Sequence, residues 1–175
     1  ISTLFSSEDI PLGVCLGKAH QHPGSVTSTT PTMGDMPSLT DLAAQSPYVV
    51  LDGAMGTMLQ QAGLDDGAAS ESWNTDRPDD VAAIHRAYLD AGAKVITTNT
   101  FGGTRPRLEL QGLGDRVHEL NREGARIARE TARPYGALVA GDIGPTGELL
   151  EPLGTLTADE AQAVFEEQAR GLVDG

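Results

Sequence analysis

YVVLDGAMGT, at residues 48–57, is the stretch from which the topology of this chain can be worked out. A short apolar run ends at Asp52 and is followed by small residues that include Gly53 and Gly56. Apolar runs of this length, bounded by turn residues, are typical of fully buried strands. An acid at the carboxyl end of such a strand lies where open α/β sheets and α/β barrels bind their ligands. The alternative is a plain turn in which Asp52 caps the next helix.

Two further stretches repeat this arrangement. Residues 94–101 form a second apolar and β-branched run, with polar Asn99 near its end. Residues 137–142 form a third run, which ends at Asp142. Helical periodicity separates and follows the runs, with long helices predicted over 78–91, 115–133 and from 158 onward, and shorter ones over 38–45, 55–62 and 108–113. Strands that are apolar throughout predict a parallel sheet covered on both faces. The chain is therefore expected to be an α/β protein whose three βα units begin a doubly wound sheet or a (βα)8 barrel.

Two side chains between the first and second strands have open interpretations. Trp73 stands alone in a polar segment, residues 64–77, and is either a lid over a pocket or a packing plug. His85 lies within the predicted helix over 78–91, and we expect it to be packed rather than catalytic.

Composition limits the classes of partner. The chain has 175 residues and a formal net charge of −13, which argues against binding to a nucleic-acid backbone or to an anionic membrane surface. No apolar run approaches the roughly 20 residues of a membrane span, and no basic region followed by an apolar block indicates a secretory signal. Cys15 is the only cysteine, so an intrachain disulfide is impossible. A cytoplasmic protein is expected.

Residues 1–37 differ in composition from the rest. They include a polar run without periodicity at residues 24–32, and Cys15, His20 and His22, which are too few to make a structural zinc site. A disordered leader is expected, with the folded domain over residues 38–175. A sharper hypothesis is that Met33 or Met36 is the natural start and that the residues before it are not native.

Three motifs together resemble one family. They are LDGAMGT at 51–57, TNTFG at 98–102 and GDIGPTGE at 141–148, and the predicted helix PDDVAAIHRAYLDAGA at 78–93 fits as well. In this order and spacing they resemble the homocysteine S-methyltransferase domain family, and most of all the modules that work with cobalamin. The resemblance covers residues 48–175.

The resemblance implies a (βα)8 TIM-type barrel, which takes about 250 residues, so the chain would hold only its first three βα units. It also implies a zinc ion held by three cysteines, and none of those positions occurs in these 175 residues; the zinc ligands are expected beyond residue 175. Zinc would hold the sulfur of homocysteine as a thiolate that attacks a methyl donor. For a cobalamin-dependent relative the donor would be methylcobalamin, recharged from methyltetrahydrofolate by cobalamin and folate modules of the full-length chain. The chain alone is expected to be inactive.

The same resemblance suggests what the residues present would do. They would hold the amino-acid end of homocysteine: Asp52 the ammonium, and the backbone N–H groups of Gly53 and Ala54 the carboxylate. The remaining candidates would line the pocket, orient a neighbour or brace the mouth: Asn99, Thr100, Asp142 and Glu148. For each candidate the competing interpretation is helix capping or turn stabilisation.

Other functions stay open. The methyl donor could be betaine or S-methylmethionine, because relatives with those donors share the barrel. The chain could also be a non-catalytic truncated product that acts through association, since part of a barrel leaves open sheet edges. A barrel enzyme with a phosphate substrate has little support, because no glycine-rich run has the spacing of a phosphate-binding loop.

Overall fold

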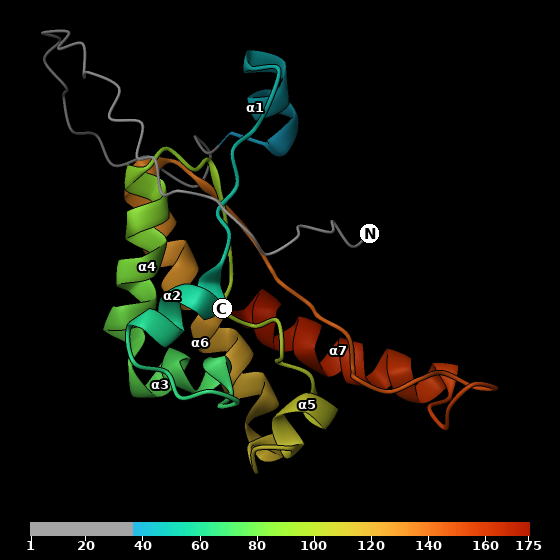
Figure 1. Ribbon diagram of the computed structural model, residues 1–175. Coiled ribbons are helices and arrows are strands. Elements are labelled where there is room, and N and C mark those ends of the chain that lie inside the picture. Colours follow the sequence, from blue (N-terminus) through green and yellow to red (C-terminus); the bar gives the residue numbers. More distant parts are fainter. Residues whose placement is uncertain (1–36) are drawn as a thin grey trace, which may run out of the picture.

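The computed structural model describes residues 37–175, in which helices pack against a small parallel sheet (Figure 1). The two strands pair in register, with Val95 opposite Leu138 and Thr97 opposite Ala140. The predicted leader and its Cys15, His20 and His22 lie outside the described residues. The elements in chain order are α1 (Leu39–Gln45), α2 (Met55–Gln61), a 3₁₀ turn (Ser70–Ser72), α3 (Trp73–Asp76), α4 (Pro78–Asp90), β1 (Val95–Thr97), α5 (Arg105–Glu109), a second 3₁₀ turn (Gly114–Arg116), α6 (Val117–Ala132), a third (Arg133–Tyr135), β2 (Leu138–Ala140) and α7 (Ala158–Asp174).

The first predicted strand is reduced to a short extended segment beside β1. Leu51 forms a single parallel bridge with Val95, and the N–H of Asp52 donates to the carbonyl of Val95 at 3.0 Å. The prediction that this strand is fully buried is wrong, because Tyr48 and Leu51 are exposed by 72% and 53%. The segment is the edge of the sheet, where the outer side has no neighbouring strand in the described part of the chain.

The core lies between the sheet and its helices. Ile96 of β1 packs with Leu89 of α4 and Ala128 of α6, and α4 and α6 run side by side in Figure 1. A second cluster contains Trp73, which is 7% exposed and lies 4.0 Å from the guanidinium of Arg77, measured to the ring centroid. Trp73 is therefore a packing plug and not a lid.

The described helices cover their side of the sheet only in part, whereas full coverage of both faces was predicted. Val139 stands opposite Ile96 in the register, so both side chains point toward the helices, yet Val139 is 36% exposed. Helix α7 approaches β2 only near its end, where a Cβ on Gly141 would lie 3.2 Å from Leu172. The apolar sequence of β2 would allow full burial, but the described helices cover this strand only in part.

The long helices agree with the predicted ranges, and their ends follow the expected chemistry. Helix α4 begins at Pro78 and is followed by Gly92 at a φ of +106°, while Thr157 and Glu160 form a reciprocal capping box at the start of α7. Helix α5 begins three residues earlier than predicted, because Pro106 fits the first turn of a helix. Among the described residues, no helix is both long enough and apolar enough to cross a bilayer.

Candidate functional site

The polar residues that follow the strands gather at one end of the sheet. Asp52 continues the segment paired with β1, Asn99 follows β1, and Asp142 follows β2, and all these pairings are parallel. The N–H of Asp142 donates to the hydroxyl of Thr98 at 2.9 Å, which ties the two strand ends together. We call the open side of this end, formed by Asp52, residues 53–54 and Asp142, the mouth.

The carboxylate of Asp52 is hydrogen-bonded to Thr97, the last residue of β1. Its Oδ2 accepts a hydrogen bond from the N–H of Thr97 at 2.9 Å, and its Oδ1 accepts one from the Thr97 hydroxyl at 3.1 Å. Burial raises the pKa of Asp52, and the two bonds from Thr97 oppose that change. The alternative in which Asp52 caps the next helix is wrong, because Ala54 is the N-cap residue of α2 and no side chain caps it.

Asp142 is a half-buried acid close to Asp52. Its pKa is raised, first by burial and then by the negative charge of Asp52. Among the described residues, the structure gives the carboxylate of Asp142 no hydrogen-bond partner or ion pair. Two neighbouring carboxylates with raised pKa values suit a cationic group, because a cation near both favours their charged forms and so offsets the cost of burial and the repulsion.

Gly53 and Ala54 lie on the exposed rim of the mouth, and Glu148 lies in the loop that follows β2. Ala54 has a φ of +41°, the left-handed conformation in which successive backbone N–H groups turn toward one side. Within residues 37–175, no acceptor is bound by the N–H groups of Gly53 and Ala54. Glu148 is exposed, and its N–H donates to the hydroxyl of Thr146 at 3.2 Å.

Asn99 and Thr100 point away from solvent into the protein. Asn99 Nδ2 donates to the carbonyl of Ser70 at 2.8 Å and to Asn74 Oδ1 at 3.0 Å, and the Thr100 hydroxyl donates to the carbonyl of Asp142 at 2.7 Å. Both side chains are buried. Of the two roles expected for them, this geometry favours orienting neighbours over lining a pocket.

Sequence reasoning missed the buried polar side chains behind the mouth. Asn74 donates to the carbonyls of Asn99 and Leu120, Asn121 donates to the carbonyl of Gly103, and Gln168 donates to that of Thr100. With Asn99 and Thr100, these residues form what we call the strand-end network. A signal was present in the helices: Asn121 and Gln168 occupy inward positions of the apolar face, where a polar residue needs a partner.

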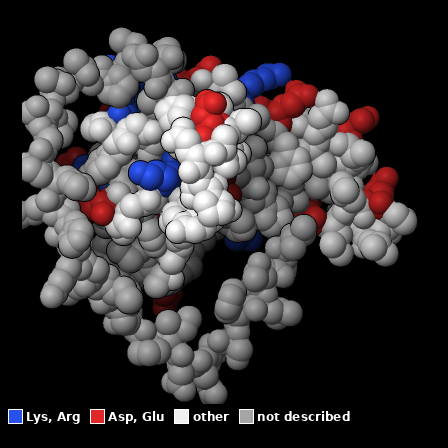
Figure 2. Space-filling view, turned by 90° about the horizontal axis from the view of Figure 1, so that it is seen from above, with Lys and Arg blue, Asp and Glu red and all other residues white. Residues whose placement is uncertain are grey.

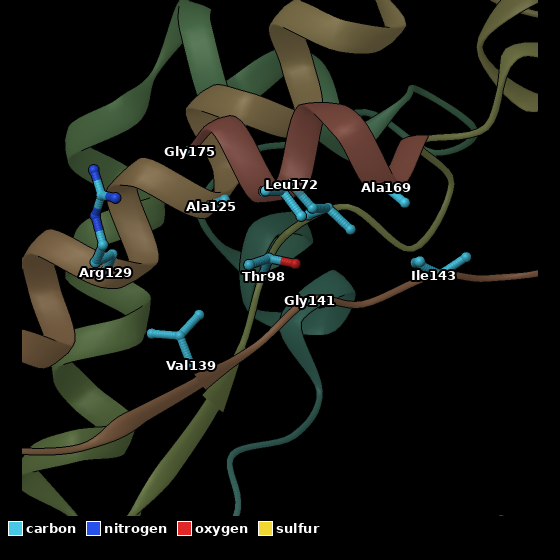
Figure 3. A pocket seen from close by; sticks show the side chains of 10 residues that line it. Thr98, Ala125, Arg129, Val139, Gly141, Ile143, Ala169, Leu172 and Gly175 are labelled. Carbon is cyan, nitrogen blue, oxygen red and sulfur yellow. The ribbon is translucent and has the colours of Figure 1, made fainter. Parts of the chain in front are cut away.

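A groove of about 480 Å³ lies on the helix side of β2, apart from the mouth. Figure 3 shows Val139, Ile143 and Leu172 around it, from the strand, the following loop and α7. Its lining is mostly apolar and includes no carboxylate side chain. Arg129 is the one charged side chain among its lining residues, so the groove offers apolar contact and no acid for a cationic ligand.

The distribution of charged and metal-ligating side chains limits what the mouth can bind. In the view of Figure 2 the Lys and Arg side chains are separate from one another, with Asp and Glu among them, so this face carries no continuous basic patch. Among the described residues, no group of three or more His, Cys, Asp or Glu side chains is arranged to hold a metal ion. The mouth is thus a small acidic site with free backbone N–H groups on its rim.

Comparison with known proteins gives a consistent result. Residues 49–175 match the family described as homocysteine S-methyltransferase. The chain is 38% identical over 148 residues to the methionine synthase of Mycobacterium tuberculosis. This match covers 78% of this chain and 12% of that protein. It is 37% identical over 138 residues to the methionine synthase of Mycobacterium leprae, covering 73% of this chain and 11% of that one.

Solved structures agree at the level of the fold. The homocysteine methyltransferase MmuM of Escherichia coli is 23% identical to this chain, with a TM-score of 0.65 for its metallated form and 0.67 for its oxidized form. The match covers 76% and 78% of this chain and 52% of MmuM in each case. The chain therefore spans about half the length of these structures and about an eighth of the mycobacterial proteins.

Proposed function

The chain belongs to the homocysteine S-methyltransferase family, and from that premise we propose that it is part of an enzyme that methylates the thiol of homocysteine to make methionine. The family match and the similarity to two methionine synthases support this proposal. Within it, the described residues form the first βα units of a (βα)8 barrel. Their task is to bind the amino-acid end of the substrate.

The observation that carries the proposal is the pair of carboxylates at the mouth. Asp52 and Asp142 both have raised pKa values, and the charge of Asp52 contributes to that of Asp142. A substrate ammonium placed between them would donate charge-assisted hydrogen bonds to both, which are stronger than neutral ones. The N–H groups of Gly53 and Ala54 would bind the substrate carboxylate, and exposed Glu148 would border the entrance.

Zinc does not fit the described residues, because they offer no cluster of metal-ligating side chains. In the proposal, zinc and the activation of the sulfur therefore belong to residues of a longer protein. Methylcobalamin as donor, and methyltetrahydrofolate as the source of its methyl group, would be brought by further modules, as the similarity to methionine synthases suggests. Betaine or S-methylmethionine remains the alternative donor.

The proposal is tested by dissecting the ligand by calorimetry or NMR titration. L-methionine carries both charged groups, 4-(methylthio)butanoate lacks the ammonium, and 3-(methylthio)propylamine lacks the carboxylate. We expect L-methionine and L-homocysteine to bind better than either analogue. Asp52→Asn should reduce the preference for L-methionine over 4-(methylthio)butanoate, because it removes one of the two carboxylates that bind the ammonium.

Controls make this outcome specific. Asp79→Asn changes an exposed acid of α4 and should leave the preference intact. Added zinc should not change the affinity, since the described residues do not hold it. Equal binding of all three ligands, or no binding of L-methionine and L-homocysteine at millimolar concentration, would refute the substrate assignment.

A second candidate function is association with another polypeptide. It is favoured by the exposed edge at Leu51 and by the apolar groove beside Val139, since unpaired edges and apolar surface promote pairing between chains. Size-exclusion chromatography distinguishes the two: a monomer that unfolds cooperatively and binds L-methionine supports the enzyme part, whereas a defined oligomer that binds no amino acid supports association.

A further inference from the structure

Gln168 of α7 joins the two strand ends from within the helix layer. Its side chain is completely buried, and its Nε2 donates to the carbonyl of Thr100 at 2.7 Å and lies 3.4 Å from the carbonyl of Asp142. The same nitrogen lies 3.1 Å from Asn121 Oδ1. One amide group thus contacts the residues after β1, the residues after β2 and helix α6.

The backbone of Asp142 is held by side chains on both sides. Its N–H donates to the hydroxyl of Thr98 at 2.9 Å, and its carbonyl accepts from the hydroxyl of Thr100 at 2.7 Å in addition to Gln168. Asp142 lies beyond the last residue of β2, so the ladder with β1 does not fix it. Its Cα is therefore placed by three polar side chains, while its own carboxylate stays free at the mouth.

A space-filling role alone does not account for Gln168. A Met or Leu would fill a similar volume without the cost of burying an amide, and that cost is raised here because Oε1 has no partner among the described residues and only Nε2 is bonded. The surrounding space is also tight, since a Cβ on Gly103 would lie 2.9 Å from Gln168 Nε2. The amide is thus held in one orientation, directed at the strand ends.

We propose that Gln168 is a positioning residue, which sets the carboxylate of Asp142 beside Asp52 so that both can bind one cationic group of an amino acid. The identity of that ligand rests on the proposed function, whereas the positioning itself does not. Gln168 would act through the carbonyls of Thr100 and Asp142, without touching the ligand. The position of α7 relative to the sheet then determines the distance between the carboxylates of Asp52 and Asp142.

The first experiment compares Gln168→Met with Gln162→Met. Gln162 lies on the same helix but is exposed, and its Nε2 bonds only to Glu166, so it controls for the loss of an amide from α7. Carboxyl pKa values are measured by NMR at a temperature where each variant is fully folded. In Gln168→Met the pKa of Asp142 should fall toward its ordinary value and the affinity for L-methionine should fall about tenfold, whereas Gln162→Met should change neither.

A purely structural role predicts a different result. Gln168→Met would then lower the melting temperature but leave the pKa of Asp142 and the affinity unchanged in the folded protein, and this outcome would overturn the proposal. If the wild-type chain binds no L-methionine, the proposed function fails, and the pKa of Asp142 in Gln168→Met still decides the positioning role.

A second experiment covers the case in which Gln168→Met does not fold. In the wild-type chain, the side-chain amide resonances of Gln168 should shift with the protonation of Asp142 as pH is lowered, because Nε2 contacts the carbonyl of that residue. The amide resonances of Gln162 should not follow this titration. If those of Gln168 do not move with Asp142 either, the proposal is wrong.

Discussion

The strand-end network and His85 are both buried and polar, and they differ in whether partners are present. In the network, Asn74, Asn99, Asn121 and Thr100 bond to carbonyls or to one another, at distances between 2.7 and 3.0 Å. His85 of α4 is equally inaccessible, yet neither of its ring nitrogens has a partner among the described residues. Within the network Gln168 Oε1 also lacks a partner among the described residues, but the Nε2 of the same amide is hydrogen-bonded, whereas both ring nitrogens of His85 lack partners.

This difference separates two effects of burying polarity. A hydrogen-bonded network contributes little net stability per hydrogen bond but fixes geometry, since few arrangements keep all of its bonds. An unsatisfied imidazole fixes nothing and must stay neutral, because charging it in an apolar environment is unfavourable. The network should therefore control the site, and His85 should control how stability depends on pH.

The largest effect is expected at His85. Burial lowers its pKa from 6.5 to about 4, so between these values the unfolded chain takes up a proton that the folded chain does not. Stability from this group is present above pH 6.5 and is lost as pH falls toward 4, by about 3 kcal/mol at most. Urea unfolding of wild type and His85→Leu at several pH values measures it, and the Leu variant should lose most of this dependence.

The control for that experiment is His118→Leu. His118 is exposed on α6, with its Nε2 2.8 Å from a carboxylate oxygen of Asp174, so removing it should leave the loss of stability below pH 6.5 largely in place. A His85→Leu variant with the wild-type pH dependence would mean that the imidazole is solvated or partnered, and the contrast between the two regions would disappear.

The next effect tests how closely the network is packed. A Cβ on Gly103 would lie closer than van der Waals contact to the amides of Asn121 and Gln168, and neither amide can move without breaking hydrogen bonds. Gly103→Ala should therefore destabilise the fold by about 2 kcal/mol. Gly56→Ala is the matched control, because nothing lies within 4 Å of that Cβ and Ala in helix α2 should stabilise by up to about 1 kcal/mol. Equal effects in urea unfolding would show that the network yields easily.

Sequence patterns predicted much of the fold for local reasons. The capping box at Thr157 and the Pro78 start depend on neighbouring residues alone, and both occur as expected. The parallel order of the strands was also predictable, because helices of this length must cross over between them. The exposure of Leu51 could not be predicted, since burial depends on which other elements cover a strand, and no local pattern indicates that.

The arrangement of the candidate site could be predicted only in part, and the limit has a physical cause. Asp52 and Asp142 were identifiable because acids at strand ends are unusual and share one edge of a parallel sheet. The partners of Asn99 are 25 and 29 positions away, and those of Gln168 are up to 68 away. Hydrogen bonds of that span leave no spacing rule in the sequence, so only the inward placement of a polar residue indicated them.

A smaller effect is expected at Thr100. Thr100→Val keeps the β-branched shape but removes the hydroxyl that donates to the carbonyl of Asp142, at a cost of about 1–2 kcal/mol. Thr131→Val is the matched control, because the Thr131 hydroxyl donates to the carbonyl of Ile127 four residues earlier, and that carbonyl keeps its helical bond. If thermal unfolding shows equal losses for both variants, the network is no more sensitive than an ordinary helix.

The smallest effect, and the one of opposite sign, is expected at Asp142. Its pKa is raised above the ordinary value of 3.8 by burial and by Asp52, so the folded chain binds the proton more tightly than the unfolded chain and ionisation at neutral pH is destabilising. Asp142→Asn should therefore be more stable than wild type at pH 7, by less than about 1 kcal/mol because the group is only half-buried. The advantage should shrink as pH falls through the raised pKa and should vanish below 3.8, where the wild-type acid is protonated in both states.

Because His85 titrates equally in both proteins, its contribution cancels in the difference, and urea unfolding of the pair isolates Asp142. A variant less stable than wild type at pH 7 would mean that the carboxylate is held by favourable contacts, and then Asp142 could not be the free acid that awaits a cation.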